Sequence, residues 1–397
     1  MSSEIDDRLS DLPDSILHLI LSFLNIKQAF QSSVLSTRWK NLPNHLPSLR
    51  LTAQHFKSME SFTKSVSQIL SHRDNSTVLH TLEFTRPEDF VEFHIIKSVV
   101  KFAVTHHVKR LQICITSDIQ LFRRCLFSSQ TLTSLQLWVH EVIQDWKMLF
   151  PNSLNLPSLT DLSLAGFCFG PGAGNDGCAD CAEPFSAFNK LNTLTILSCR
   201  VLKARNLSIS STSLVNLTMS GYYLNIDDQF QLHLCAPSLR NFAFTGTPNQ
   251  KLCLSHPCSL QHLYIDSTDI SANFTVEGSV TMVEEDSTLL LSWLQELPSI
   301  KSLTVSSNTL QVLSFVPDLF KVKFSSMCNL ESLKVEMKPL TRELDMKLGI
   351  AASLKEDEDT KFNLRQGPFI PDGVVDFLLQ NSPSTKVNII PINARGF

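Results

Sequence analysis

Large apolar residues recur along most of the chain in the spacing Leu-X-X-Leu-X-Leu, with Val, Ile, Met or Phe in place of some leucines. Successive copies begin 21 to 40 residues apart. The last two apolar positions of each copy alternate with other residues, which predicts a short strand with one buried face. The clear copies begin at Leu79, Val108, Leu132, Leu159, Leu191, Leu214, Leu239, Leu260, Ile300 and Leu330.

The recurring strands predict a repeat architecture, because most intervals lie near the ~20–29 residues typical of leucine-rich repeats. Parallel strands require a crossover, which the residues between copies supply as a helix or an irregular loop. We therefore expect an α/β repeat solenoid, a leucine-rich-repeat horseshoe with its parallel sheet on the concave face. Leu46, Leu49 and Leu51 are candidates for a first strand, and Val387 and Ile389 for a last one. A capping helix is expected at 373–379.

The N-terminal residues follow a different, helical pattern. Apolar residues between Ile16 and Leu24 cover more than one face of a helix that begins near Pro13. A second helix is expected at 27–35, and a third, capped by Ser36, at 37–42. Because helices this short cannot build a robust core alone, the pattern implies a partner.

The segments 12–24 and 33–39 resemble an F-box, in which Leu-Pro and an amphipathic helix precede a Ser-X-Val-Cys-basic-basic-Trp ending. Leu35 and Ser36 stand where that motif often has Cys, and Thr37 replaces one basic residue. The resemblance covers residues 8–48 and implies a three-helix domain that docks onto a Skp-type adaptor, which bridges to a cullin and a RING protein. The adaptor-facing residues that it implies are Leu12, Pro13, Ile16, Leu17, Ile20, Leu21, Leu24, Val34, Leu35 and Trp39.

The F-box followed by a leucine-rich array at 49–397, with irregular repeats and a C-terminal cap, resembles plant F-box/leucine-rich-repeat proteins. That family implies a substrate-recognition subunit of a Skp–cullin–F-box (SCF) ubiquitin ligase, whose repeats bind an unknown protein target for ubiquitination and proteasomal degradation. One alternative is a small-molecule, hormone-like co-receptor with a pocket near Phe167, Tyr222 and Tyr223. Another is a ligase-independent scaffold whose N-terminal helices only cap the array, with their apolar faces covered by the chain itself.

The residues beside the central leucine of each strand should line the exposed face of the sheet. Most are small and polar, without an Arg or Lys cluster that would hold an inositol polyphosphate or an acidic tail. Aromatic anchors dominate many protein interfaces, so we expect target contacts at aromatic and His residues along these strands and near their ends. These candidates are Trp138, Phe167, Tyr222, Tyr223, His262 and Tyr264.

Charge and composition exclude several classes of partner. A net charge of −4 and a pI near 6.3 provide no basic field for nucleic acid. The longest early uncharged run, 15–26, is too short for a membrane span, and the acidic N-terminus is unlike a signal peptide. We expect a cytoplasmic or nuclear protein, or one found in both, with free thiols and no membrane partner.

The sequence contains no nucleophile elbow, phosphate loop or metalloprotease motif, so we expect no enzymatic activity and no cofactor. Cys178 and Cys181, with Cys168 upstream, lack the second pair that a zinc site needs, and we expect no metal. Cys199 and Asn308 each follow a strand by three positions. We expect both to bond the backbone of an adjacent loop rather than to react.

Overall fold

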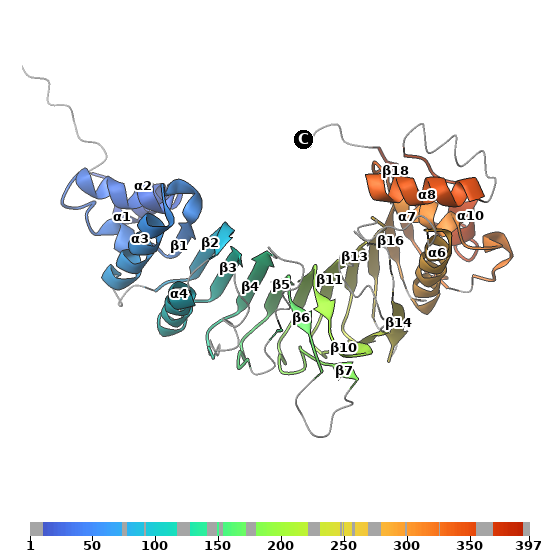
Figure 1. Cartoon of the computed structure of the whole chain (residues 1–397), viewed down its shortest axis with the longest axis horizontal. Helices are drawn as coiled ribbons and strands as arrows, with labels where there is room; N and C mark the ends of the chain where they lie inside the picture. The colour runs from blue at the N-terminus through green and yellow to red at the C-terminus, as the bar shows by residue number, and fades with distance from the viewer. Residues whose placement is uncertain are drawn as a thin grey trace, which may run out of the picture. The chain divides into compact units, whose positions relative to one another are not determined.

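The computed structural model of the chain describes residues 11–73, 78–90, 93–116, 128–140, 149–150, 154–171, 180–220, 231–246, 248, 250–255, 259–268, 279–297, 300–324, 326–354 and 368–391. The chain divides into two compact units, Met1–Ser163 and Leu164–Phe397. Figure 1 labels their helices and strands. Each unit combines parallel strands with helices, as expected for an α/β repeat protein.

The first unit begins with two short α-helices, α1 (Asp14–Ser22) and α2 (Ile26–Gln31), followed by two 3₁₀ helices, η1 (Ser32–Val34) and η2 (Leu42–His45). The Asn25 side chain and Gln28 form a capping box at the start of α2. The expected third helix at 37–42 is wrong, because residues 37–41 form turns. A proline fits only the first turn of a helix, and Pro43 lies in the first turn of η2, so the helical residues start at Leu42.

The first unit continues with parallel strands whose motif positions lie in register. Leu49 pairs with Leu82, Leu82 with Leu111, and Leu111 with Leu135, and all four side chains are buried. The elements are β1 (Ser48–Thr52), η3 (Ala53–His55), α3 (Met59–His72), β2 (Thr81–Phe90), α4 (Phe93–Thr105), β3 (Arg110–Thr116), β4 (Ser134–His140) and β5 (Asp161–Ala165), which crosses the boundary between the units.

The second unit repeats the same arrangement in its main sheet. The central apolar positions form a continuous paired row, and the side chains of this row are buried from β8 to β17. The strands, in spatial order, are β8 (Thr193–Leu197), β11 (Asn216–Ser220), β13 (Asn241–Thr245), β15 (His262–Asp266), β16 (Ser302–Ser306), β17 (Ser332–Glu336) and β18 (Lys386–Ile390). The expected terminal strands at both ends of the array are therefore present.

A second parallel sheet occupies several crossovers of this unit, where the sequence predicted helix or loop. Leu232 and Leu234 are buried at alternate positions, which is the pattern of a strand, and Leu207 and Ile209 are buried too. The strands are β7 (Cys181–Ala182), β10 (Asn206–Ser210), β12 (Gln231–Cys235) and β14 (Lys251–Leu254), and a separate pair is formed by β6 (Cys168–Phe169) and β9 (Arg200–Val201).

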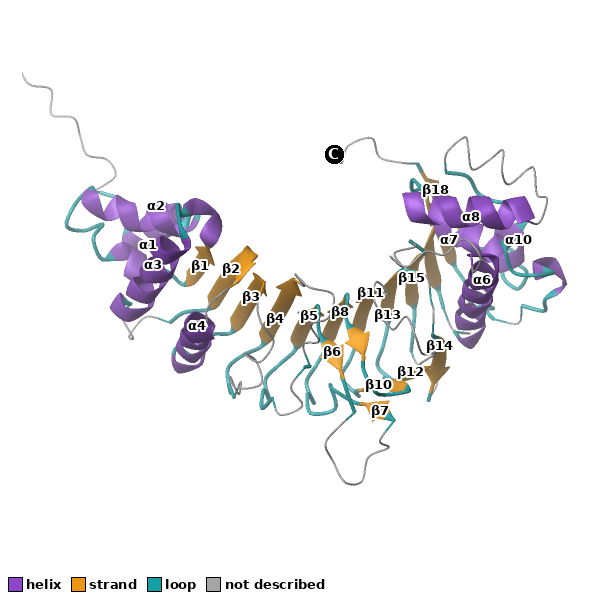
Figure 2. Cartoon of the chain, in the orientation of Figure 1, coloured by secondary structure: helices purple, strands orange, loops and turns teal. Residues whose placement is uncertain are grey.

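Helices gather around the later strands of the second unit (Figure 2). The buried Trp293 of α6 packs on Phe242 and Phe244 of β13 and donates to the Gln250 carbonyl at 2.7 Å. The helix begins at Ser279, and the acidic residues 284–286 lie within it. These elements are α6 (Ser279–Glu296), α7 (Ser307–Ser314), η5 (Leu319–Lys321), α8 (Arg342–Leu354) and the capping helix α10 (Val374–Leu378).

Within the described ranges, none of the helices is both long and apolar enough to cross a membrane.

The paired apolar row should dominate the stability of each unit. We expect Leu303→Ala, in the middle of the row, to lower the free energy of unfolding by about 2–5 kcal/mol. Thr304→Ala, on the opposite face of the same strand, should change it by less than about 1 kcal/mol. Urea unfolding of both variants measures the difference, and equal losses would contradict the assignment of the core face.

Candidate functional site

The N-terminal helices surround a small apolar core. Leu17 and Leu21 lie one turn apart on α1 and pack with Trp39, Leu42 and other side chains. Leu12 and Ile20 are partly buried against this core. Leu17, Leu21 and Trp39, expected to face a partner, are therefore core residues.

Several other large apolar side chains of this region are exposed. Val34 is 85% exposed and Phe23 80%, which is unusual for large apolar residues in a folded domain. Ile16, Leu19 and Phe23 follow one another at intervals of three and four residues, so they share one face of α1 and its C-terminal end. We call the set the helical apolar surface; it comprises Ile16, Leu19, Phe23, Leu24, Val34 and Leu35.

Arg38 ties the turn before Trp39 to the start of α1. Its guanidinium donates to Asp14 Oδ1 at 2.6 Å and 3.1 Å and to the Leu12 carbonyl oxygen at 2.5 Å. The Pro13 carbonyl oxygen accepts from the backbone N–H groups of the first helical turn. The exposed ion pair contributes little stability itself but holds Leu12 and Pro13 in one position relative to the core.

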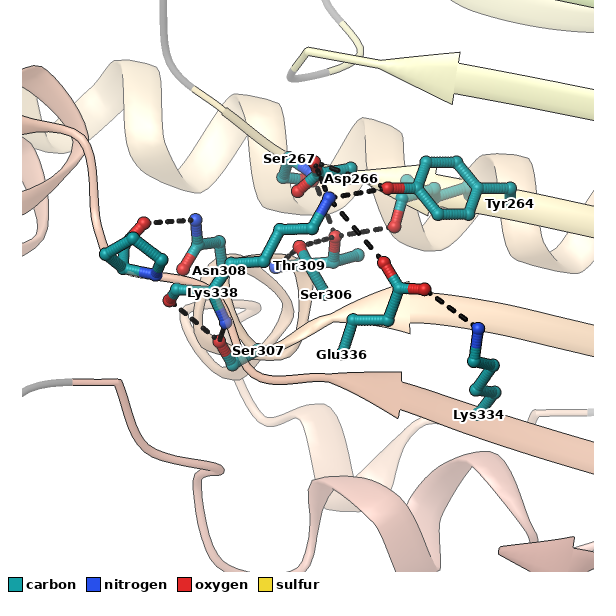
Figure 3. A network of polar contacts seen from close by, with 12 residues as sticks. Tyr264, Asp266, Ser267, Ser306, Ser307, Asn308, Thr309, Lys334, Glu336 and Lys338 are labelled. Carbon is teal, nitrogen blue, oxygen red and sulfur yellow. Dashed lines mark hydrogen bonds and ion pairs between the residues drawn. The ribbon is translucent and has the colours of Figure 1, made fainter. Parts of the chain in front are cut away.

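A second candidate site lies at the carboxyl ends of β15, β16 and β17 in the other unit. Figure 3 shows the Lys338 ammonium between Tyr264, Asp266 and Glu336. Lys338 Nζ lies 2.6 Å from the Tyr264 hydroxyl, 2.6 Å from Asp266 Oδ2 and 3.6 Å from Glu336 Oε2. Lys334 pairs with the other oxygen of Glu336 at 3.0 Å. We call these five residues the strand-end network.

The residues at the start of α7 hydrogen-bond to the backbone beside this network. The Ser306 side chain accepts from the backbone N–H of Thr309, which caps the helix. The Thr309 hydroxyl donates to the Ile265 carbonyl at 3.0 Å and accepts from the Ser267 N–H at 2.9 Å. The Ser307 hydroxyl bonds both the N–H and the carbonyl of Lys338. The Lys338 backbone is thus fixed, and its ammonium points at Asp266.

The charges in the strand-end network stabilise one another. Burial would lower the pKa of Lys338, but its hydrogen bonds to Asp266 and Tyr264 raise it well above the ordinary value. Burial would raise the pKa of Glu336, yet the neighbouring lysines lower it. Burial raises the pKa of the Tyr264 hydroxyl. These groups therefore stay in one ionisation state near neutral pH and form a rigid, nearly neutral patch rather than an acid–base pair.

Residues 9–51 match the family model for the F-box domain, close to the expected 8–48. The chain carries an F-box. The helical apolar surface and the Arg38 contact belong to this domain.

The chain is similar to plant proteins whose names combine an F-box with leucine-rich repeats. One F-box/FBD/LRR-repeat protein of Arabidopsis thaliana is 33% identical over 269 residues, which is 62% of this chain and 51% of that relative. Another is 25% identical over 379 residues, covering 89% of this chain and 82% of the relative. The chain thus spans about half of the first relative's length. The expected resemblance to plant F-box/leucine-rich-repeat proteins is confirmed.

The F-box residues selected from sequence divide into several groups in the structure. Leu17, Leu21 and Trp39 are buried and Leu12 and Ile20 partly so, whereas Pro13, Ile16, Leu24, Val34 and Leu35 are exposed. Sequence reasoning did not select Leu19 or Phe23, although both lie in the apolar run that covers more than one helix face.

The candidate target contacts have different environments. Phe167 is fully buried, so its ring is not available on the surface. Half-buried Trp138 donates to the Ser163 hydroxyl at 3.1 Å, and exposed His262 lies on β15 two residues before Tyr264. Tyr222 and Tyr223 lie outside the described residues. Sequence reasoning missed Asp266 and Lys338, which join Tyr264 in the network.

Cys199 and Asn308 both bond to backbone carbonyl oxygens, as the sequence predicted. Cys199 is buried and donates to the Leu197 and Leu164 carbonyl oxygens, and the Asn308 amide donates to the Pro339 carbonyl at 3.4 Å. Cys168 is buried, Cys181 is half-buried, and Cys178 lies outside the described residues. Over the ranges that the structure describes, no group of three or more Cys, His, Asp or Glu residues could hold a metal ion.

Removing the Lys338 ammonium should destabilise the second unit, because it leaves the Asp266 carboxylate buried without its cation. We expect Lys338→Met to lower the free energy of unfolding by about 2 kcal/mol. Adding Asp266→Asn should restore part of that loss, which urea unfolding of the single and double variants would measure. A double variant less stable than the single one would contradict the pairing.

Cys199 should be unreactive in the folded protein. Burial raises the pKa of its thiol from 9.0 to about 12, so almost no thiolate forms at pH 8. Iodoacetamide at pH 8 should label exposed Cys328 first and Cys199 only after urea unfolding, as read by peptide mass spectrometry. Between pH 9 and 12 the unfolded thiol ionises while the folded one does not, so stability should fall as pH rises. Equal labelling of both cysteines in the native protein would contradict this environment.

Proposed function

We propose that this protein is a non-catalytic substrate-recognition subunit of an SCF ubiquitin ligase. Its F-box binds a Skp-type adaptor, and through it a cullin and a RING protein, which supply ubiquitin transfer. The repeats bind a protein target in the cytoplasm or nucleus and deliver it for ubiquitination and proteasomal degradation. In this proposal the array is a horseshoe with the parallel sheet on its concave face.

The observation that carries the proposal is the helical apolar surface. Phe23, Val34 and Leu35 are exposed to water. Large exposed apolar side chains favour association, so their presence on a small domain indicates a binding surface. The buried core of the domain is separate, so these side chains are free to bind a partner without unfolding it.

The target side of the proposal rests on the exposed face of the strands. Tyr264 pairs across the sheet with Thr304, and Thr304 with Lys334, so these side chains form one row. The Lys338 ammonium lies 5.4 Å from the centre of the Tyr264 ring and holds it in place. A preorganised aromatic side chain loses little entropy on binding, which favours Tyr264 as a target contact. His262 and Trp138 are further candidates.

The two alternatives have weaker support. The co-receptor interpretation requires an accessible pocket near Phe167, whose side chain is fully buried. The ligase-independent scaffold requires the apolar faces of the N-terminal helices to be covered by the chain, whereas Phe23 and Val34 are among the most exposed of its large apolar residues.

Adaptor binding tests the proposal directly. The chain co-expressed with a Skp-type adaptor should elute with it at one-to-one in size-exclusion chromatography. Val34→Lys and Phe23→Lys should each weaken the complex by about 30-fold or more, because a charge replaces an apolar contact. Binding constants from calorimetry measure the loss.

The matched control is Val78→Lys, which places the same charge at another exposed valine outside the F-box. It should bind the adaptor as the wild type does. Leu17→Ala should instead unfold the F-box, because that side chain is fully buried. A wild-type chain that binds none of several adaptors, or a Val34→Lys variant with unchanged affinity, would overturn the proposal.

A further inference from the structure

The main sheet of the second unit ends on a strand whose core positions are exposed. Val387 and Ile389 of β18 pair with Leu333 and Val335 of β17, which are fully buried. Their own side chains are 43% and 53% exposed. The apolar row that runs through the sheet is therefore open at its last strand.

Among the residues that the structure describes, the backbone of β18 is also unpaired on the side away from β17. The Lys386 N–H donates to the Glu331 carbonyl, and the Ile390 carbonyl accepts from the Met337 N–H. Because backbone groups alternate in direction along a strand, residues 386, 388 and 390 face β17, and 387 and 389 face outward. In the described part of the chain, no strand pairs with that outward edge.

An edge of this kind normally carries charges or proline that prevent further pairing. Here the strand begins with Lys386 and is followed by Pro391, while the middle residues Val387, Asn388 and Ile389 are uncharged. The pattern of these three residues, apolar then polar then apolar, is the same when it is read in either direction. The strand can therefore match a reversed copy of itself.

We propose that β18 pairs antiparallel with β18 of a second copy of this chain, about a twofold axis at Asn388. Val387 then lies opposite Ile389 of the second copy, and both residues present outward N–H and carbonyl groups that bond each other. The apolar side chains of the two copies lie on the same face and cover one another. Lys386 lies opposite Ile390, so like charges are not opposed.

Other antiparallel registers between two copies of β18 leave an apolar side chain or a backbone group without a suitable partner. Centring the axis on Val387 places Ile389 opposite Thr385, which leaves its apolar side chain without an apolar partner. Centring it on Ile389 places Pro391, which has no N–H, opposite Val387. The Asn388 register alone buries both apolar residues against apolar ones, and such a contact is closed by twofold symmetry.

The mass of the 397-residue chain in solution tests this interface. Light scattering should give twice 44.6 kDa at high concentration, falling toward 44.6 kDa on dilution. Val387→Lys and Ile389→Lys should be monomeric at concentrations where the wild type is dimeric. Val34→Lys, in the F-box, should remain dimeric, which separates this interface from adaptor binding. A wild type that is monomeric at every concentration would overturn the proposal.

A disulfide cross-link tests the register itself. Residues opposite each other in a non-hydrogen-bonded pair have Cα atoms about 4.5 Å apart, within disulfide range. Asn388→Cys should therefore form a covalent dimer on mild oxidation. Lys386→Cys should not, because the two copies of that residue would be about 13 Å apart. Equal cross-linking of the two variants and the wild type would overturn the proposed pairing.

Discussion

The structure depends on one constraint: the apolar residues of successive parallel strands must pair in register to form a continuous buried row. A shift of one residue would turn every side chain of a strand to the opposite face. Leu263 pairs with Leu303 although 40 residues separate them, and Phe242 pairs with Leu263 across 21. The strands are therefore fixed by their own short motif, while the crossovers between them can vary in length and structure.

The same constraint determines where binding residues can lie. Because the second and fourth positions of a strand are committed to the core, the intervening side chains are left on the other face. Tyr264 and Lys334 occupy such positions on strands held rigidly by the buried row. Substitutions on this face change its chemistry with little cost to the fold, which is how a repeat array acquires a specific target.

The sequence predicted what depends on local spacing. The Leu-X-X-Leu-X-Leu motif located the strands of the main sheet, and Leu-Pro with the later Trp located the F-box. It could not locate the second sheet, whose strands carry only short alternations such as Leu232 and Leu234. It also missed the contact between Asp266 and Lys338, because these residues are 72 positions apart and meet only when β15 and β17 lie on either side of β16. Within α1, an apolar run that covers several faces does not distinguish core Leu17 from exposed Phe23.

The strands at the two ends of the array obey the same rule with different outcomes. In the first unit, Leu49 and Leu51 of β1 are fully buried, because the preceding helices and the neighbouring β2 cover them. In the second unit, Val387 and Ile389 of β18 hold the equivalent positions and are exposed. A paired row ends without cost only where something apolar covers its last members. The N-terminal helices provide this cover for β1 and still expose a second apolar face. Among the described residues, no strand pairs with the outer edge of β18, and its apolar residues match those of a reversed copy. Both regions leave apolar side chains exposed, and exposed apolar area favours association, so the same physical effect underlies both proposals.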